Sequence, residues 1–189
     1  MSKAARAVGP VAVAFLAACG SGTGPDAGTT AEYDGGMSFG TATLSGAATG
    51  TAPVTAWVVA SRASDGGSTL NFSVGGQAQL PAPFFYCSGS FPGSSLVPGS
   101  FTPPELDERD LGCALLEGTD QAFQAWQVVT AFVLNINSPG PAYPTNTCCA
   151  DSPPFWPYPS GSLTVTLAPY PEYTYGNATV NVTFGPPPQ

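Results

Sequence analysis

Apolar and polar residues alternate along several stretches of the chain from about Met37 onward. The clearest runs are residues 162–167 and 177–184, in which Leu, Val, Ala and Phe take every second position and Ser, Thr and Asn stand between them. A period of two with one apolar face is typical of a β-strand that is buried on one side. The same pattern predicts strands at residues 54–61 and 69–74, joined by a hairpin turn at Asp65-Gly66-Gly67.

Residues 122–137 allow two interpretations. As a strand, the stretch places six residues on one face and Val129, Ala131 and Val133 on the other, which suits a long central strand covered on both sides. As a helix, a shorter segment would begin near Thr119. The aromatic and β-branched residues favour the strand. The residues on its first face are Trp126, Val128, Thr130, Phe132, Leu134 and Ile136.

Short strands separated by Gly and Pro, of which the chain has 23 and 21, predict an all-β domain. We expect an antiparallel β-sandwich, Ig-like or jelly-roll-like, with a small β-barrel as the alternative and with loops held by disulfides. Residues 32–185 are enough for one domain with a substantial core, and residues 186–189 form a Pro-rich tail. Long loops are expected at residues 103–112 and 138–160, and a longer hairpin loop, compared with the turn at Asp65-Gly66-Gly67, at residues 169–176.

The beginning of the chain has the layout of a secretory signal. Lys3 and Arg6 precede an apolar stretch from residue 7 to residue 18, which ends in small residues. This stretch is shorter than the about 20 apolar residues that cross a bilayer. It runs into Leu16-Ala17-Ala18-Cys19, which resembles the lipobox of bacterial lipoproteins.

In that class the cysteine carries diacylglycerol through a thioether, the signal is removed and the new amino terminus is acylated. The resemblance implies that residues 1–18 are removed, that Cys19 is lipidated and that residues 19–31 form a flexible Gly/Ser-rich tether. Gly20 stands where an Asp retains lipoproteins of enteric bacteria in the inner membrane, so the outer membrane is the expected location. Runs such as Gly-Ser-Leu-Thr-Val-Thr-Leu from Gly161 also resemble, in style, uncharacterised β-sandwich envelope lipoproteins of high-GC bacteria, which have no assigned activity.

The chain is acidic, with a net charge of −8. Once residues 1–18 are removed, its only basic residues are Arg62 and Arg109, because no Lys and no His remain. We expect no nucleic-acid partner, since phosphates require clustered Lys or Arg. Anionic lipid headgroups would not attract the acidic domain either, so the attachment to the membrane depends on the covalent lipid expected on Cys19.

The four cysteines after Cys19 are expected to form disulfides, because an exported chain enters an oxidising compartment. A bond between the neighbours Cys148 and Cys149 would be strained, so we predict that Cys87 and Cys113 each pair with one of them. We expect no metal site at these thiols, since the chain lacks histidine and paired C-x-x-C units.

The loop at residues 103–112 is acidic and is a candidate cation site. Asp107, Glu108 and Asp110 supply the oxygen ligands that Ca²⁺ prefers. Their spacing departs from the EF-hand pattern, and the alternative is a solvated turn whose charge Arg109 partly offsets.

The loop at residues 138–160 is rich in aromatic side chains, which could stack on a sugar ring or fill a pocket of a partner. In the alternative interpretation, Phe155 and Trp156 cap one end of the core, as large aromatic residues usually do. The candidate binding residues are Tyr143, Phe155, Trp156 and Tyr158.

The sequence predicts no catalytic residue. Ser-His-Asp and Cys-His arrangements need a histidine, and the chain has none. Two carboxylates could hydrolyse a glycoside, but nothing in the sequence pairs Glu105, Glu117, Asp120 and Asp151. We therefore expect a non-catalytic surface or periplasmic interaction module, without a cofactor, whose partner is a protein or a glycan. The alternative is a carbohydrate-binding or carbohydrate-cleaving domain.

Overall fold

A computed structural model of the protein describes residues 35–62, 67–76, 83–103, 111–119, 122–145 and 152–187. The chain divides into the units Met1–Ala31 and Glu32–Gln189, and all the described residues belong to the second unit. The regular elements of this part are all β-strands, which confirms the predicted all-β class.

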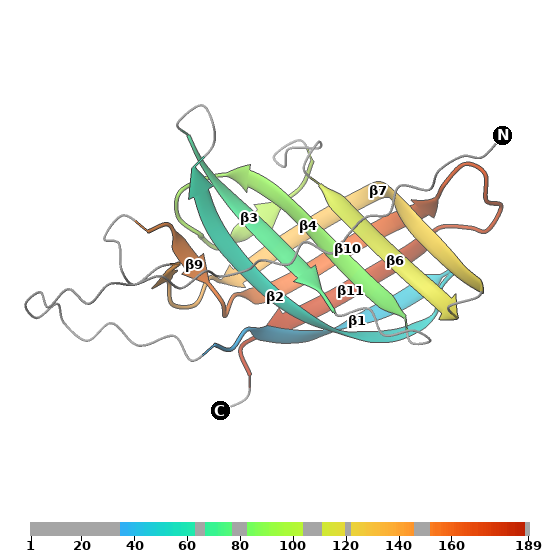
Figure 1. The fold of residues 1–189 in the computed structure, drawn as a ribbon, viewed down its shortest axis with the longest axis horizontal. Coiled ribbons are helices and arrows are strands. Elements are labelled where there is room, and N and C mark those ends of the chain that lie inside the picture. Colours follow the sequence, from blue (N-terminus) through green and yellow to red (C-terminus); the bar gives the residue numbers. More distant parts are fainter. Residues whose placement is uncertain are drawn as a thin grey trace, which may run out of the picture. The chain divides into compact units, whose positions relative to one another are not determined.

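Eight strands form a closed antiparallel sheet in which each strand pairs with the strands that precede and follow it around the circle (Figure 1). The first and last of them, β1 and β11, pair with each other and so close the sheet. The fold is therefore an up-and-down barrel. Its strands are β1 (Ser38–Gly46), β2 (Gly50–Arg62), β3 (Ser68–Gly75), β4 (Phe84–Pro92), β6 (Gly112–Thr119), β7 (Ala122–Ser138), β10 (Ser160–Pro169) and β11 (Ala178–Gly185).

The sheet is the small barrel of the alternative prediction rather than the favoured sandwich. A sandwich consists of two separate sheets packed face to face. Here β1 is paired along both edges, so that Thr41 lies opposite Pro53 of β2 and Thr183 of β11. The alternation of apolar and polar residues is the same in both architectures, because each strand buries one face in either case.

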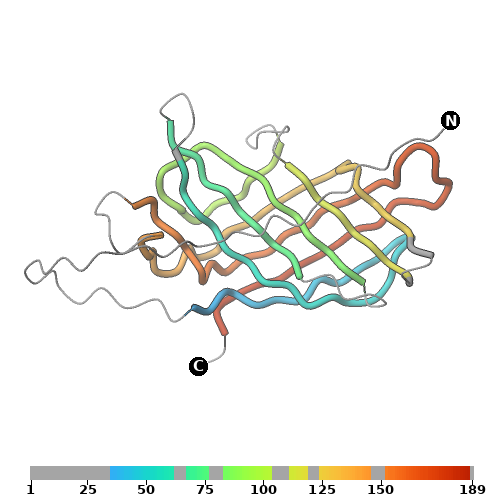
Figure 2. Tube along the Cα trace, in the orientation of Figure 1, coloured from blue at the N-terminus to red at the C-terminus, as the bar shows by residue number. Residues whose placement is uncertain are grey.

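Short strands extend the barrel wall at the end where β1 begins and β11 ends, which we call the terminal end. β5 (Gly99–Phe101) pairs with β7. β8 (Tyr143–Pro144) and β9 (Pro154–Trp156) pair with each other within the predicted loop, and β9 also pairs with β2. We call the opposite end of the barrel the hairpin end; there, residues 170–177 join β10 to β11. This loop lies at the right of Figures 1 and 2, whereas β9, at the terminal end, lies at the left of Figure 1.

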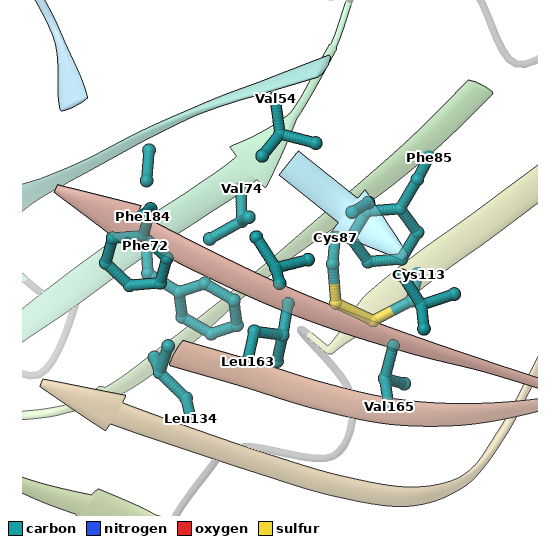
Figure 3. Packing of buried hydrophobic residues seen from close by; sticks show 14 of the residues in the cluster. Val54, Phe72, Val74, Phe85, Cys87, Cys113, Leu134, Leu163, Val165 and Phe184 are labelled. Carbon is teal, nitrogen blue, oxygen red and sulfur yellow. A yellow bond between two sulfur atoms is a disulfide. The ribbon is translucent and has the colours of Figure 1, made fainter. Parts of the chain in front are cut away.

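Apolar side chains of alternate residues fill the interior of the barrel (Figure 3). The buried side chains of β2 are all Ala or Val, whereas β3, β4 and β7 contribute phenylalanine rings. Glycine makes room for such rings. Gly89 lies opposite Phe72, and a Cβ at Gly89 would come within 2.8 Å of the Phe72 ring. Small and large residues thus complement one another, as a narrow barrel requires.

The stretch predicted as a long central strand is β7, but its register against β10 shifts twice within the predicted alternation. Trp126, Val129 and Phe132 therefore lie in or against the core at intervals of three residues. Val128, which a period of two would bury with Trp126, is 39% exposed. A bulge adds one residue to one strand, which turns the residues after it to the other face. The predicted division of this stretch into two faces is therefore wrong between the two irregularities.

A disulfide joins Cys87 on β4 to Cys113 on β6 inside the barrel (Figure 3). The two residues lie directly opposite each other on neighbouring strands, with their Cα atoms 4.0 Å apart. The predicted pairing of each with Cys148 or Cys149 is therefore wrong, because spacing along the chain does not reveal which residues face each other in a sheet. Cys148 and Cys149 lie outside the described residues.

Candidate functional site

The connection between β10 and β11, residues 170–177, carries three tyrosines and is called the tyrosine loop below. It begins with a closed turn, in which the N–H of Tyr173 donates to the C=O of Tyr170 at 2.9 Å. Pro171 occupies the second position of this turn, where its fixed φ is favourable. Glu172 is the third residue and is exposed. The sequence therefore specifies a compact turn between the first two tyrosines.

Tyr175 fastens the loop to the barrel wall. Its hydroxyl accepts a hydrogen bond from the N–H of Ala125 at 3.0 Å and donates one to the C=O of Ala125 at 2.9 Å. The last pairing of β10 with β7 is that of Pro169 with Trp126, one residue away from Ala125. The tyrosine hydroxyl thus forms hydrogen bonds with both backbone groups of Ala125, as the next residue of a neighbouring strand would.

Three aromatic rings connect the tyrosine loop to the core. The ring of Trp126 is fully buried, and its Nε1–H donates to the C=O of Gly176 at 2.9 Å. Tyr175 meets this indole edge-on, with ring centroids 4.9 Å apart. Tyr173 in turn stacks on Tyr175, with centroids 5.4 Å apart and planes inclined by 26°. Because the inner rings are fixed by packing and hydrogen bonds, Tyr173 is held in a defined position at the surface.

The outer side of the loop exposes aromatic surface. Tyr170 is 44% exposed and Tyr173 is 50% exposed, and nearby on the wall Val128 is 39% exposed. The Tyr170 hydroxyl donates to Oε1 of Gln127 at 2.7 Å, which fixes this ring as well. Sequence reasoning predicted only a hairpin loop here and missed these residues. The available signal was the spacing of three tyrosines and a proline within six residues of the chain, from Tyr170 to Tyr175.

The aromatic residues predicted for binding lie at the terminal end and do not share one surface. Trp156 is opposite Val58, faces the interior and is only 4% exposed, so it is a core residue and not part of a binding surface. Its neighbour Phe155 faces outward, with its ring 6.2 Å from that of Trp57. Successive residues of a strand point to opposite faces, which explains the separation. Tyr143, paired with Phe155, and Tyr158 are both partly buried.

A small recess of about 210 Å³ lies at the terminal end near Phe155. Serines and prolines make up most of its lining, and the hydroxyl of one of them, Ser61, is hydrogen-bonded to the Nδ2 of Asn71 at 2.8 Å and to the hydroxyl of Thr69 at 2.9 Å. We call Trp57 and Phe155 together with this recess the aromatic wall. The recess is lined by Ala60, Ser61, Ser68, Ser94, Ser152, Pro153 and Pro154.

Carboxylates are scarce in the described part of the chain, where they are limited to Glu117 and Glu172. Glu117 lies on β6 opposite Gln124 and is partly buried. The described residues hold no group of three or more His, Cys, Asp or Glu placed to bind a metal ion. The other predicted positions lie outside the described residues, namely Cys19, Glu105, Asp107, Glu108, Asp110, Asp120, Cys148, Cys149 and Asp151.

No helix able to span a bilayer occurs in the part of the chain that the structure describes. Comparisons with protein-family models, with curated protein sequences and with solved structures find no match to this chain. Of the tyrosine loop and the aromatic wall, the tyrosine loop has the more exposed rings, and hydrogen bonds of Tyr175 and Trp126 fasten it to the barrel.

Proposed function

We propose that the protein is a lipid-anchored, non-catalytic interaction module of the bacterial cell envelope, which binds its partner through the tyrosine loop. The lipobox resemblance implies the anchor at Cys19. One observation carries the binding role: the loop is fastened to the core, yet two of its tyrosine rings are 44% and 50% exposed.

A fixed aromatic side chain is well suited to binding. Tyrosine offers a large contact area together with a hydroxyl, and such rings are frequent among the residues that dominate binding energy. Binding costs less when the side chain does not have to be immobilised. The hydrogen bonds of Tyr170 and Tyr175 and the stacking of Tyr173 supply this order in advance.

The path of the chain also supports this role. The tether, residues 19–31, leads to the beginning of β1 at the terminal end of the barrel. The tyrosine loop lies at the hairpin end, and Figure 2 shows the beginning of β1 and this loop at opposite ends of the strands. The tether would therefore join the barrel at the end opposite the tyrosine loop.

The alternative function is a carbohydrate-binding or carbohydrate-cleaving domain, and the aromatic wall is the observation that favours it. An aromatic pair beside a recess of mixed polar and apolar lining suits a sugar, which presents both apolar faces and hydroxyl groups. Cleavage would need two carboxylates around the scissile bond. The carboxylates among the described residues are limited to Glu117 and Glu172, so binding is the better-supported form of this alternative.

The anchor is tested by labelling cells that express the full chain with radioactive palmitate. Cys19→Ser should abolish the label on the protein, whereas the neighbouring change Ser21→Ala should keep it. Intact mass should show acyl groups on a chain that begins at Cys19. Equal label on the Cys19→Ser protein would contradict the lipid anchor.

The binding role is tested in the same cells by photo-crosslinking. A benzophenone-bearing phenylalanine at Tyr173 should give partner adducts on irradiation, and the same group at Thr43, on the exposed face of β1, should not. Both positions are exposed, so accessibility alone cannot produce the difference. Equal labelling at the two positions, or none at Tyr173, would overturn the assignment of the loop.

A further inference from the structure

We infer that the ligand of the tyrosine loop is a neutral glycan, one sugar ring of which lies flat on Tyr173. This inference rests on the proposed role of the loop as a binding surface and specifies the chemistry of its partner. Three properties of the loop lead to it: the size of the exposed patch, its charge and the arrangement of its rings.

The exposed aromatic surface of the loop is small. A tyrosine side chain offers about 150–250 Å² when it becomes fully buried. With Tyr170 and Tyr173 about half exposed and Val128 somewhat less, the patch amounts to a few hundred Å². A standard protein interface covers about 800 Å² on each partner. The exposed rings therefore match the footprint of one or two sugar units.

The charge of the patch opposes anionic ligands. Glu172 is the charged residue of the loop, and residues 170–177 include no basic residue. A phosphate or an acidic polysaccharide would thus meet a carboxylate without an Arg or Lys of the same loop, which such groups require. Hydroxyl groups of a neutral glycan can instead donate hydrogen bonds to the carboxylate of Glu172.

The arrangement of the rings suits a flat ligand. Quaternary ammonium groups are held in cages of several aromatic faces, whereas the loop offers a single exposed face at Tyr173. Tyr173 stacks on Tyr175 with an interplanar angle of 26°, so one of its faces is covered and the other is a single flat platform. The apolar face of a sugar ring fits such a platform, while its hydroxyl groups remain in water.

The test uses the full mature lipoprotein in phospholipid nanodiscs, because sugar-based detergents would compete for the site. Saturation-transfer NMR is recorded with neutral hexasaccharides of glucose, mannose and N-acetylglucosamine, with the cationic hexamer of glucosamine and with the anionic hexamer of galacturonic acid. We expect binding of at least one neutral oligosaccharide and none of the anionic one.

Variants locate the bound sugar. Tyr173→Ala should weaken binding by about tenfold, as expected when one aromatic stacking contact is lost. Tyr173→Phe keeps the platform and should retain binding. The matched control is Phe39→Ala, since Phe39 is 56% exposed but lies at the terminal end of the barrel. Thermal melting checks that all three variants remain folded.

The outcomes separate this inference from the proposed function. Binding of the cationic oligosaccharide alone, or neutral binding that Tyr173→Ala leaves unchanged, overturns the neutral-glycan inference. If Tyr173 crosslinks to a protein in cells and no oligosaccharide binds, the interaction module stands and the glycan inference fails. If neither crosslinking nor binding occurs, both proposals fail.

Discussion

The hydroxyl of Tyr175 is the contact that most directly tests how the tyrosine loop is held. Tyr175→Phe removes this hydroxyl and keeps the ring that packs against Trp126 and Tyr173. The change breaks two hydrogen bonds, one to the N–H and one to the C=O of Ala125. Each contributes about 1 kcal/mol net, so we expect the free energy of unfolding to fall by about 2 kcal/mol.

The assay is thermal and urea unfolding of the full mature protein, followed by circular dichroism. For a domain of this size, about 2 kcal/mol corresponds to a Tm that is lower by about 4–8 °C. The matched control is Tyr173→Phe, which removes a hydroxyl from the same loop at a side chain that is 50% exposed. A surface change of this kind should alter stability by no more than about 0.5 kcal/mol.

Equal stability of Tyr175→Phe and Tyr173→Phe would refute this prediction. It would mean that water replaces the Tyr175 hydroxyl as the hydrogen-bond partner of the Ala125 backbone without loss of stability. A second readout follows from the proposed function. If Tyr175→Phe loosens the loop, ligand binding at Tyr173 should weaken even though Tyr175 itself is not the contacting ring.

Three further predictions concern the barrel. The disulfide between β4 and β6 joins residues with a sequence separation of 26. Its reduction should lower the free energy of unfolding by about 3–4 kcal/mol. Equal urea midpoints with and without reductant would contradict this prediction. Gly161→Ala should lower the free energy of unfolding by about 3 kcal/mol or more, because the added Cβ would collide with the carbonyl oxygen of Asn135. Gly112→Ala places its Cβ in open space and should leave the stability nearly unchanged in the same assay. Val129→Thr should lower the free energy of unfolding by about 1–2 kcal/mol, because it buries a hydroxyl against the core. Val128→Thr should leave the stability unchanged, because Val128 is exposed. A larger loss of stability for Val128→Thr than for Val129→Thr would refute the register shifts in β7.

Period-two alternation predicted the strands whose two faces differ in polarity. β10 and β11 are the clearest cases, since Ser, Thr and Asn stand between buried Leu, Val, Ala and Phe. β4 was not predicted, because Phe84 and Tyr86 on its outer face are aromatic like Phe85 and Phe91 on its inner face. Alternation is invisible where both faces have similar side chains.

The features that sequence reasoning could not supply depend on contacts between distant segments. Closure of the sheet is decided by the pairing of β1 with β11, and alternation along either strand carries no information about its partner. The disulfide has the same origin, because Cys87 and Cys113 meet through the pairing of β4 with β6. In the tyrosine loop, the sequence shows three tyrosines but not that Tyr175 is anchored while Tyr170 and Tyr173 are exposed.

The pairing of the first strand with the last also constrains when the domain can fold. Ser45 and Thr179, which lie opposite each other in β1 and β11, are 134 positions apart in the chain. Contacts of such high sequence separation slow folding, because a long loop must be closed before they form. A nascent chain that lacks β11 would keep two unpaired strand edges, on β1 and β10, and such edges promote aggregation. The barrel therefore cannot close before β11 has been synthesised.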